Sequence, residues 1–210
     1  MNIMKLDLKK ELKELYKVSG KEVAIVKVPQ QKIISIIGKG NPNTSIDFKN
    51  AVEALFPVAY KIKFTYKKSG KDYAVMPLEG LWWAENMNDF SISNKDNWQW
   101  KIFIVQPDFV SKETFDSIID DINKEKNLLA LGKVKFETLS EGISAQILHL
   151  GSFANEGPTI NKLHDFIKEK GYSFDGLVQK HHEIYLSDIR KTPPQKLKTI
   201  LRQPVKNISK

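Results

Sequence analysis

The sequence predicts an α+β fold in which one structural unit occurs twice. Short β-branched segments bounded by Pro or Gly occur in pairs. Each pair precedes a helix-periodic segment and two further strands, over residues 21–107 and again over residues 132–205. This order favours antiparallel pairing with the helices on one side of each sheet. We therefore expect two antiparallel sheets with a central cleft and helices on the outside.

The first unit follows an N-terminal amphipathic helix, expected within residues 1–20 because apolar residues recur at helical spacing from 3 to 16. A long helix is expected over residues 48–70, where apolar residues fall at i, i+3, i+4 and i+7, with a kink at Pro57. Composition and flanking Pro and Gly residues predict the strands of this unit at residues 22–29, 32–40, 72–77 and 98–107.

The second unit is joined to the first by a helix at residues 111–127, for which Ser111 is the expected N-cap. Pro158 and Gly171 mark the start and the end of the helix within this unit. Its strands are expected at residues 134–139, 143–151, 181–188 and 196–204.

The two units also align with each other. Residues 33–38 match residues 146–151 in pattern, and the alignment makes Ala74 the counterpart of Glu183 and Met76 the counterpart of Tyr185. Residues 21–210 are therefore expected to form a single domain of two pseudo-symmetric repeats.

The composition excludes several classes of site. The chain has no cysteine and four histidines, so a disulfide framework, a thiolate nucleophile and a Cys-based zinc site are ruled out. We expect no metal and no cofactor. No apolar run approaches the roughly 20 residues that a membrane span needs, and the N-terminus lacks the features of a secretory signal. These features predict a cytoplasmic protein with no membrane partner.

The formal charge of +8 raises the question of nucleic-acid binding. Only Arg190 and Arg202 among the 33 basic residues are arginines, whereas base reading depends heavily on Arg. The lysines are spread along the chain rather than grouped in blocks. We expect a Lys-rich solvated surface and no direct nucleic-acid binding; nothing in the sequence specifies an oligomeric state.

One motif in the second unit resembles a known family. Residues 183–188 read Glu-Ile-Tyr-Leu-Ser-Asp and resemble the Glu-Ile-Tyr-Leu-x-Asp element of GyrI-like small-molecule-binding domains. Residues 73–83, which read Tyr-Ala-Val-Met-Pro-Leu-Glu-Gly-Leu-Trp-Trp, resemble the stand-alone subgroup that includes cyclopropanoid cyclopropyl hydrolases. Regulators of this family carry a separate helix-turn-helix region. The roughly twenty residues before the first strand are too few for one.

Strand alternation predicts which side chains reach the cleft. Glu183, Tyr185 and His181 share one face of their strand, whereas His182 and Ile184 share the other. We expect the apolar set to lie under the helices, which leaves Glu183 and Tyr185 facing the cleft. Tyr73 and His149 are expected in the core. The expected ligand-binding residues are Trp82, Trp83, Trp98, Trp100, Met76, Glu79 and His181.

The resemblance also implies a reaction and a partner. Glu183 would deprotonate a water that opens a cyclopropane ring on a planar organic small molecule, and Tyr185 would hydrogen-bond Glu183 or the ligand. A detoxifying hydrolase that needs no metal is the function we expect first. Two alternatives stay open: a non-catalytic module that sequesters planar or cationic drugs, and an inhibitory protein-interaction domain.

Overall fold

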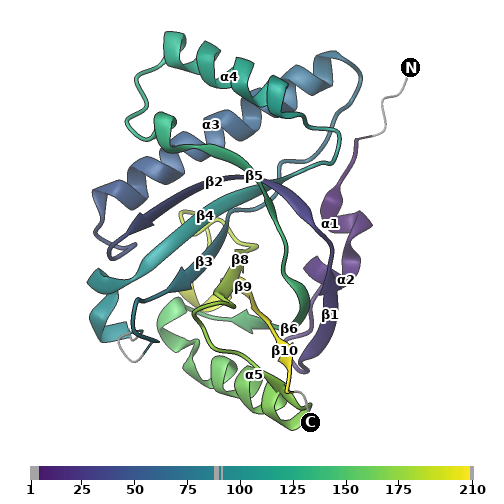
Figure 1. The fold of residues 1–210 in the computed structure, drawn as a ribbon, viewed down its shortest axis with the longest axis vertical. Helices are drawn as coiled ribbons and strands as arrows, with labels where there is room; N and C mark the ends of the chain where they lie inside the picture. Colours follow the sequence, from purple (N-terminus) through teal and green to yellow (C-terminus); the bar gives the residue numbers. More distant parts are fainter. Residues whose placement is uncertain (1–4, 88–89, 91, 209–210) are drawn as a thin grey trace.

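The computed structural model describes residues 5–87, 90 and 92–208 and confirms the α+β class (Figure 1). The helices of this part are α1 (Leu8–Glu11), α2 (Lys13–Tyr16), α3 (Ile46–Lys68), α4 (Lys112–Glu125) and α5 (Gly157–Glu169). The strands are β1 (Ala24–Val28), β2 (Gln31–Lys39), β3 (Glu79–Trp83), β4 (Gln99–Gln106), β5 (Lys135–Leu139), β6 (Gly142–Leu150), β7 (Tyr172–Ser173), β8 (His181–Tyr185), β9 (Lys198–Pro204) and β10 (Lys206–Asn207). Short 3₁₀ helices lie at Ile92–Asn97, Leu131–Lys133, Phe153–Asn155 and Pro194–Lys196.

Within the described residues, the strands form one large curled antiparallel sheet with the order β1-β6-β9-β8-β3-β4-β2-β5, and β10 pairs with β7 separately. The first strands of the two units are exchanged, because β1 pairs with β6 and β5 pairs with β2. The two predicted sheets are therefore the halves of a single sheet. The two halves meet where β3 pairs with β8, and Gly80 lies opposite Glu183 at this junction. Each of these two strands supplies backbone hydrogen bonds to the edge that the other would leave unpaired.

One predicted strand is misplaced. Residues 72–77 are not part of the large sheet; Tyr73 instead forms an isolated bridge with Leu6 near the N-terminus. Pro77 lacks the N–H that a sheet ladder requires, and β3 begins only at Glu79. Aligning Ala74 and Met76 with Glu183 and Tyr185 was therefore wrong.

The helices agree better with their predicted limits. The N-terminal helix is divided into α1 and α2 at Leu12, and Ile3 of the predicted stripe lies outside the described residues. Ser45 caps α3, which continues through Pro57 to Lys68. Ser111 caps α4, as predicted.

The long helices α3 and α5 lie on the same face of the sheet, over different halves. α3 packs on β2 and β4, whereas α5 packs on β6, with Leu163 and Ile167 against Ile147 and Leu201. In Figure 1, α3 and α4 lie at one end of the molecule and α5 at the other. The central strands β3 and β8 are left open between them on this face.

The prediction that Ile184 and its apolar neighbours lie under the helices was therefore wrong. Ile184 faces the opposite side of the sheet, where it belongs to a core that includes Leu15 and Tyr16 of α2. The curled sheet and α2 cover this reverse face at its centre.

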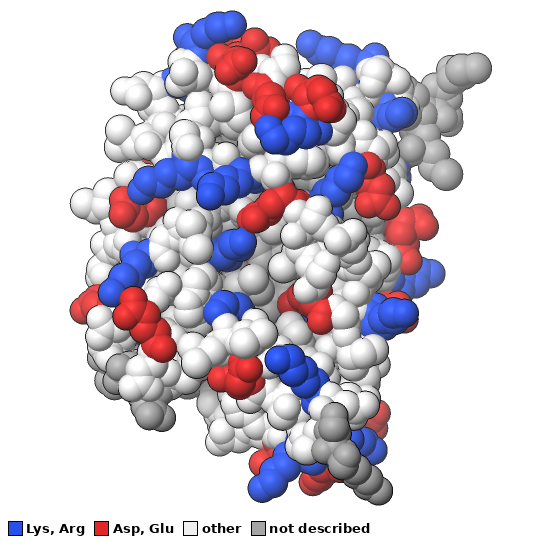
Figure 2. Space-filling model, viewed as in Figure 1, with Lys and Arg blue, Asp and Glu red and all other residues white. Residues whose placement is uncertain are grey.

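Charged side chains of both signs are interspersed over the face seen in Figure 2. Among the described residues, no helix is long and apolar enough to cross a membrane.

Candidate functional site

A cavity of about 870 Å³ lies between α3 and α5, over the central strands. Its size falls within the range of small-molecule sites, about 300–1,000 Å³. The helix α3 contributes Phe48, Val52 and Phe56 to its wall, and α5 contributes Ile160 and His164. The cleft is thus on the helix-bearing face, in the gap that α3 and α5 leave over β3 and β8.

Glu183 lies in the floor of this cavity, where it is 9% exposed. The hydroxyl of Tyr185 donates a hydrogen bond to Glu183 Oε2 at 2.8 Å, and His181 Nε2 lies 3.3 Å from Glu183 Oε1. Trp82 Nε1 donates to the Tyr185 oxygen at 3.0 Å. Burial and the adjacent Glu183 raise the pKa of Tyr185 well above its usual value. The Tyr185 hydroxyl therefore orients the Glu183 carboxyl group, and the His181 ring lies beside its other oxygen.

Gly80 makes this arrangement possible. It pairs directly with Glu183 across the β3–β8 junction and faces the same side of the sheet. A Cβ atom at this position would lie 2.8 Å from Trp82 Nε1 and 3.2 Å from the Tyr185 oxygen. The absence of a side chain leaves room for the Trp82–Tyr185 hydrogen bond.

A second carboxyl group, that of Glu156, also lines the cavity. Glu156 is 5% exposed and occupies the N-cap position of α5, and its Oε1 has no hydrogen-bond partner in the part of the chain described. Burial and the charge of Glu183 raise the pKa of Glu156 to about 9, against the opposing effect of Lys95. At neutral pH, Glu156 is therefore a protonated acid and a hydrogen-bond donor.

His149 holds the loop that carries Glu156. Its Nδ1 lies 3.0 Å from Thr159 Oγ1, and its Nε2 lies 3.1 Å from the carbonyl oxygen of Ser152. His149 is 4% exposed, so the prediction of a packed core histidine is confirmed.

Aromatic rings line one side of the cavity. Phe90 stacks on Trp98 with centroids 4.5 Å apart, and Trp98 meets Trp82 edge to face at 5.8 Å. Phe48 of α3 packs on Trp82 at 5.8 Å. Such a wall favours flat aromatic ligands, which bind by stacking and edge contacts.

The structure brings most of the predicted site residues together and separates three of them. The cavity is lined by Met76, Trp82, Trp98, His181, Glu183 and Tyr185. Trp100 instead lies in the core under α3, edge to face with Phe48, where Gly38 leaves space for its ring. Trp83 projects from β3 on the face opposite Trp82, and the ammonium of Lys180 lies over its ring.

Glu79 does not face the cleft, contrary to our prediction. It is fully buried on the reverse face of β3, because it pairs with Ile184 and not with Glu183. There it accepts a hydrogen bond from the Tyr16 hydroxyl at 3.0 Å and lies 3.0 Å from His182 Nε2.

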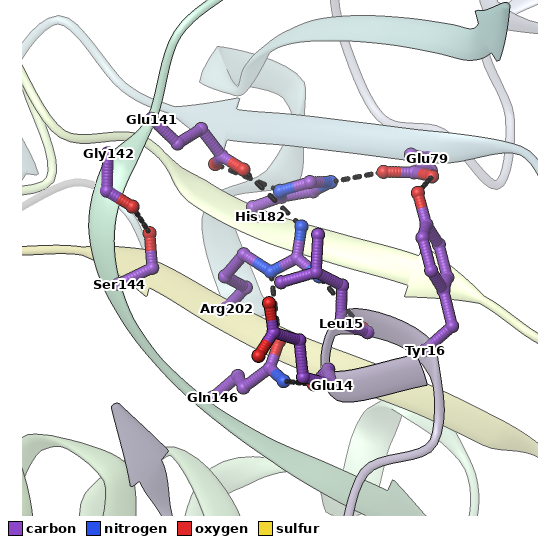
Figure 3. Close-up of polar contacts among 10 residues, drawn as sticks. All are labelled: Glu14, Leu15, Tyr16, Glu79, Glu141, Gly142, Ser144, Gln146, His182 and Arg202. Carbon is purple, nitrogen blue, oxygen red and sulfur yellow. Dashed lines mark hydrogen bonds and ion pairs between the residues drawn. The ribbon is translucent and has the colours of Figure 1, made fainter. Parts of the chain in front are cut away.

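Glu79 belongs to a buried ionic network shown in Figure 3. His182 lies between Glu79 and Glu141, with 3.0 Å from each ring nitrogen to a carboxylate oxygen. Arg202 Nη1 lies 3.5 Å from Glu141, and its Nη2 donates to the Leu15 carbonyl oxygen at 2.9 Å. Burial alone would lower the pKa of His182, but Glu141 and Glu79 raise it to about 9. The network ties α2 to the strands that carry the cavity floor.

Sequence reasoning missed Glu156, Gln203, His164 and the inner face of α3. Glu156 was given no role, although an acidic residue directly before the Gly157-Pro158 helix start is a signal that could have identified it. The apolar stripe of α3 was recognised, but the sequence pattern does not distinguish a cavity wall from a packed core.

Among residues 5–87, 90 and 92–208, no three His, Cys, Asp or Glu side chains are grouped so that they could hold a metal ion. The polar groups of the cavity instead suit proton exchange: the Glu183 carboxyl group accepts from Tyr185 and lies beside His181, and Glu156 is a separate protonated carboxyl.

Comparison with known proteins agrees with this geometry. Residues 21–206 match the model of the GyrI-like small molecule binding domain. A crystal structure of an uncharacterized conserved protein from Listeria innocua has a TM-score of 0.90 and 36% identity, over 96% of this chain and 100% of that one. A hydrolase from the same organism has a TM-score of 0.87 and 35% identity, over 97% of this chain and 100% of that one.

A more distant likeness concerns the fold alone. The C-terminal domain of EcmrR has a TM-score of 0.56 and 12% identity, over 89% of this chain and 98% of that domain. No match was found among curated protein sequences. Because the family model spans most of the sequence, the chain belongs to the GyrI-like family of small-molecule-binding domains.

Proposed function

We propose that this protein binds planar organic molecules in the cavity between α3 and α5 and hydrolyses those that carry a strained cyclopropane ring. The observation that carries the proposal is that Glu183, oriented by the Tyr185 hydroxyl, and the protonated Glu156 line the same cavity beside an aromatic wall. The structural similarity to a hydrolase from Listeria innocua supports an enzymatic role. Such an activity would detoxify alkylating compounds, and we place it in the cytoplasm.

The chemistry needs a base and an acid. Glu183 takes a proton from water, and the water oxygen forms a bond to the ring carbon while the cyclopropane C–C bond breaks. The released electron pair moves through the conjugated ring system to the carbonyl oxygen, which takes a proton from Glu156. The product is a ring-opened alcohol and phenol. The proton gained by Glu183 and the one lost by Glu156 balance, so exchange with solvent restores both groups.

Tyr185 and the aromatic wall have supporting roles in this proposal. Tyr185 keeps Glu183 oriented, because its hydroxyl donates to Oε2 and itself accepts from Trp82. Trp82, Trp98 and Phe90 would hold the flat ligand between ring faces and edges, which positions the reacting carbon beside Glu183.

The test is incubation of the protein with a planar cyclopropanoid compound, followed by chromatography and mass spectrometry to detect the water adduct. We expect turnover by the wild type and a loss of about 10²-fold or more in the Glu183→Gln and Glu156→Gln variants. Glu53→Gln is the matched control, because Glu53 is exposed on α3, where it lies 3.8 Å from Lys49.

Two outcomes would contradict the hydrolase. Full turnover by Glu183→Gln would exclude Glu183 as the base. Tight binding by the wild type with no water adduct would instead favour the second candidate, sequestration of a planar or cationic drug, for which the acidic floor and aromatic wall are also suited.

A further inference from the structure

The side chain of Gln203 on β9 links two histidines at the edge of the cavity. Its Nε2 lies 3.2 Å from His181 Nδ1 and 2.8 Å from His164 Nε2. Gln203 is 1% exposed, and its Oε1 is buried without a hydrogen-bond partner among the residues described. The NH₂ group of this buried amide is hydrogen-bonded, whereas its carbonyl oxygen is not. Burying an unpaired carbonyl oxygen costs free energy, so the orientation of the amide is explained by what its NH₂ group binds.

The direction of these hydrogen bonds follows from Glu183. His181 Nε2 lies 3.3 Å from Glu183 Oε1, and because a carboxylate oxygen only accepts, this close approach is favourable when Nε2 carries a hydrogen. In a neutral imidazole the other nitrogen, Nδ1, is then an acceptor and has to face a donor. The NH₂ group of Gln203 supplies this donor, and the carbonyl end of the amide could not.

The second hydrogen of the amide is used in the same way. His164 Nε2 accepts it if His164 is neutral with its hydrogen on Nδ1. Burial lowers the pKa of His164, which favours the neutral ring. One amide nitrogen therefore donates to both histidines.

We propose that Gln203 is a positioning residue that holds His181 as the neutral tautomer with its hydrogen on Nε2, directed at Glu183. An imidazolium at His181 would form an ion pair with Glu183 and weaken it as a base, whereas the neutral tautomer orients the carboxylate without cancelling its charge. The effect on catalysis rests on the proposed function, whereas the assignment of the His181 tautomer does not depend on it.

The test is NMR of protein labelled with ¹⁵N at histidine, without ligand, at pH 8. Long-range ¹H–¹⁵N spectra distinguish the two neutral tautomers and the imidazolium, and a His181→Asn variant assigns the signals of His181. We expect the Nε2–H tautomer in the wild type. Gln203→Glu, which offers only an acceptor, is expected to move the hydrogen to Nδ1 or to produce the imidazolium.

Two further variants keep the test decisive. Gln203→Met has a similar shape without donors, so it is expected to give a mixture of tautomers even if Gln203→Glu does not fold. Gln99→Leu on β4 removes an amide that contacts Glu85 rather than His181, so it is expected to leave the tautomer unchanged. An Nδ1–H or imidazolium signal in the wild type, or an unchanged Nε2–H tautomer in both Gln203 variants, would overturn the proposal.

Kinetics then separate this proposal from the proposed function. If the protein hydrolyses cyclopropanoids, Gln203→Glu is expected to lower kcat by up to about 10²-fold with little change in KM. If the wild type shows no hydrolase activity but the Gln203 variants change the tautomer of His181, the positioning role of Gln203 stands and only the proposed hydrolysis is contradicted. An unchanged kcat in a variant with a changed tautomer would overturn the catalytic consequence.

Discussion

The two faces of β8 place neighbouring titratable residues in opposite environments. His182 on the reverse face is enclosed by Glu79 and Glu141 and has no exposed surface. His181 and Glu183 on the other face line a cavity, where their polar contacts are with one another, with Tyr185 and with Gln203.

The difference shows how a single strand can place a closed ionic network on one face and the wall of a cavity on the other. On the reverse face the charges of two acids are matched by those of His182 and Arg202, so the network is satisfied and closed. On the cavity face Glu183 accepts a hydrogen bond from Tyr185, lies 3.3 Å from His181 and lines the cavity, so a ligand can reach its carboxyl group.

Breaking the reverse face is expected to have the largest effect. His182→Ala leaves Glu79 and Glu141 buried without the cation between them, which should cost about 3–5 kcal/mol of unfolding free energy. Urea denaturation at pH 7 measures this change. His181→Ala is the matched control from the same strand and should cost clearly less, because Gln203 and Glu183 retain access to the cavity. Equal losses in both variants would contradict the assignment of the two faces.

The same network predicts a pH dependence. The folded pKa of His182 is raised from 6.5 to about 9, so its contribution is complete below pH 6.5 and is lost as the pH rises through about 9. The loss is on the order of 3 kcal/mol. Burial alone would raise the pKa of Glu141, but His182 and Arg202 lower it, so that contribution is lost in acid. Urea midpoints between pH 6.5 and 9.5 should fall in the wild type and change less in His182→Gln.

On the cavity face, a substitution is expected to stabilise the protein. The pKa of Glu156 is raised from 4.5 to about 9, so folding at neutral pH takes up a proton and stability falls as the pH rises between these values. Glu156→Gln removes this cost and should add about 1–3 kcal/mol to the unfolding free energy at pH 7, whether or not the proposed hydrolysis occurs. Urea unfolding of both proteins at pH 5 and pH 8 measures this gain in unfolding free energy, which should be larger at pH 8. A variant less stable than the wild type at both values would contradict the buried acid.

The sequence predicted correctly which face of β8 carries Glu183, but not which elements of the fold surround that face. Strand alternation correctly separated Glu183 and Tyr185 from His182, because a period of two depends only on the local backbone. Strand alternation could not show that α3 and α5 lie on the cavity face, since the position of a helix depends on tertiary contacts with particular strands. Glu79 was assigned to the wrong face for a related reason. Its face depends on where β3 begins after Pro77, and a shift of one residue in the strand register would turn its side chain towards the cavity.

Narrowing the cavity floor should have an intermediate effect. Gly80→Ala places a methyl group 2.8 Å from Trp82 Nε1, so the indole has to move and its bond to Tyr185 weakens. We expect a loss of about 1–3 kcal/mol in stability and weaker binding of a planar aromatic probe. Thermal unfolding and fluorescence titration measure the two effects. Gly132→Ala is the control, because nothing in the described chain lies within 4 Å of its added Cβ. Unaltered binding by Gly80→Ala would show that Trp82 does not shape the site.

The smallest expected effect distinguishes two tryptophans that the sequence treats alike. Trp98 stacks on Phe90 in the cavity wall, whereas Trp83 projects from the reverse face of β3 beside Lys180. Trp98→Leu should lose the aromatic contribution to ligand binding, about 0.5–1.5 kcal/mol, which corresponds to at most about a tenfold rise in Kd. Trp83→Leu should leave Kd unchanged, because its ring does not reach the cavity. Isothermal titration with one planar ligand compares both variants. If Trp83→Leu weakened binding as much as Trp98→Leu, the ligand would have to contact both faces of β3, and the separation of the two faces would fail.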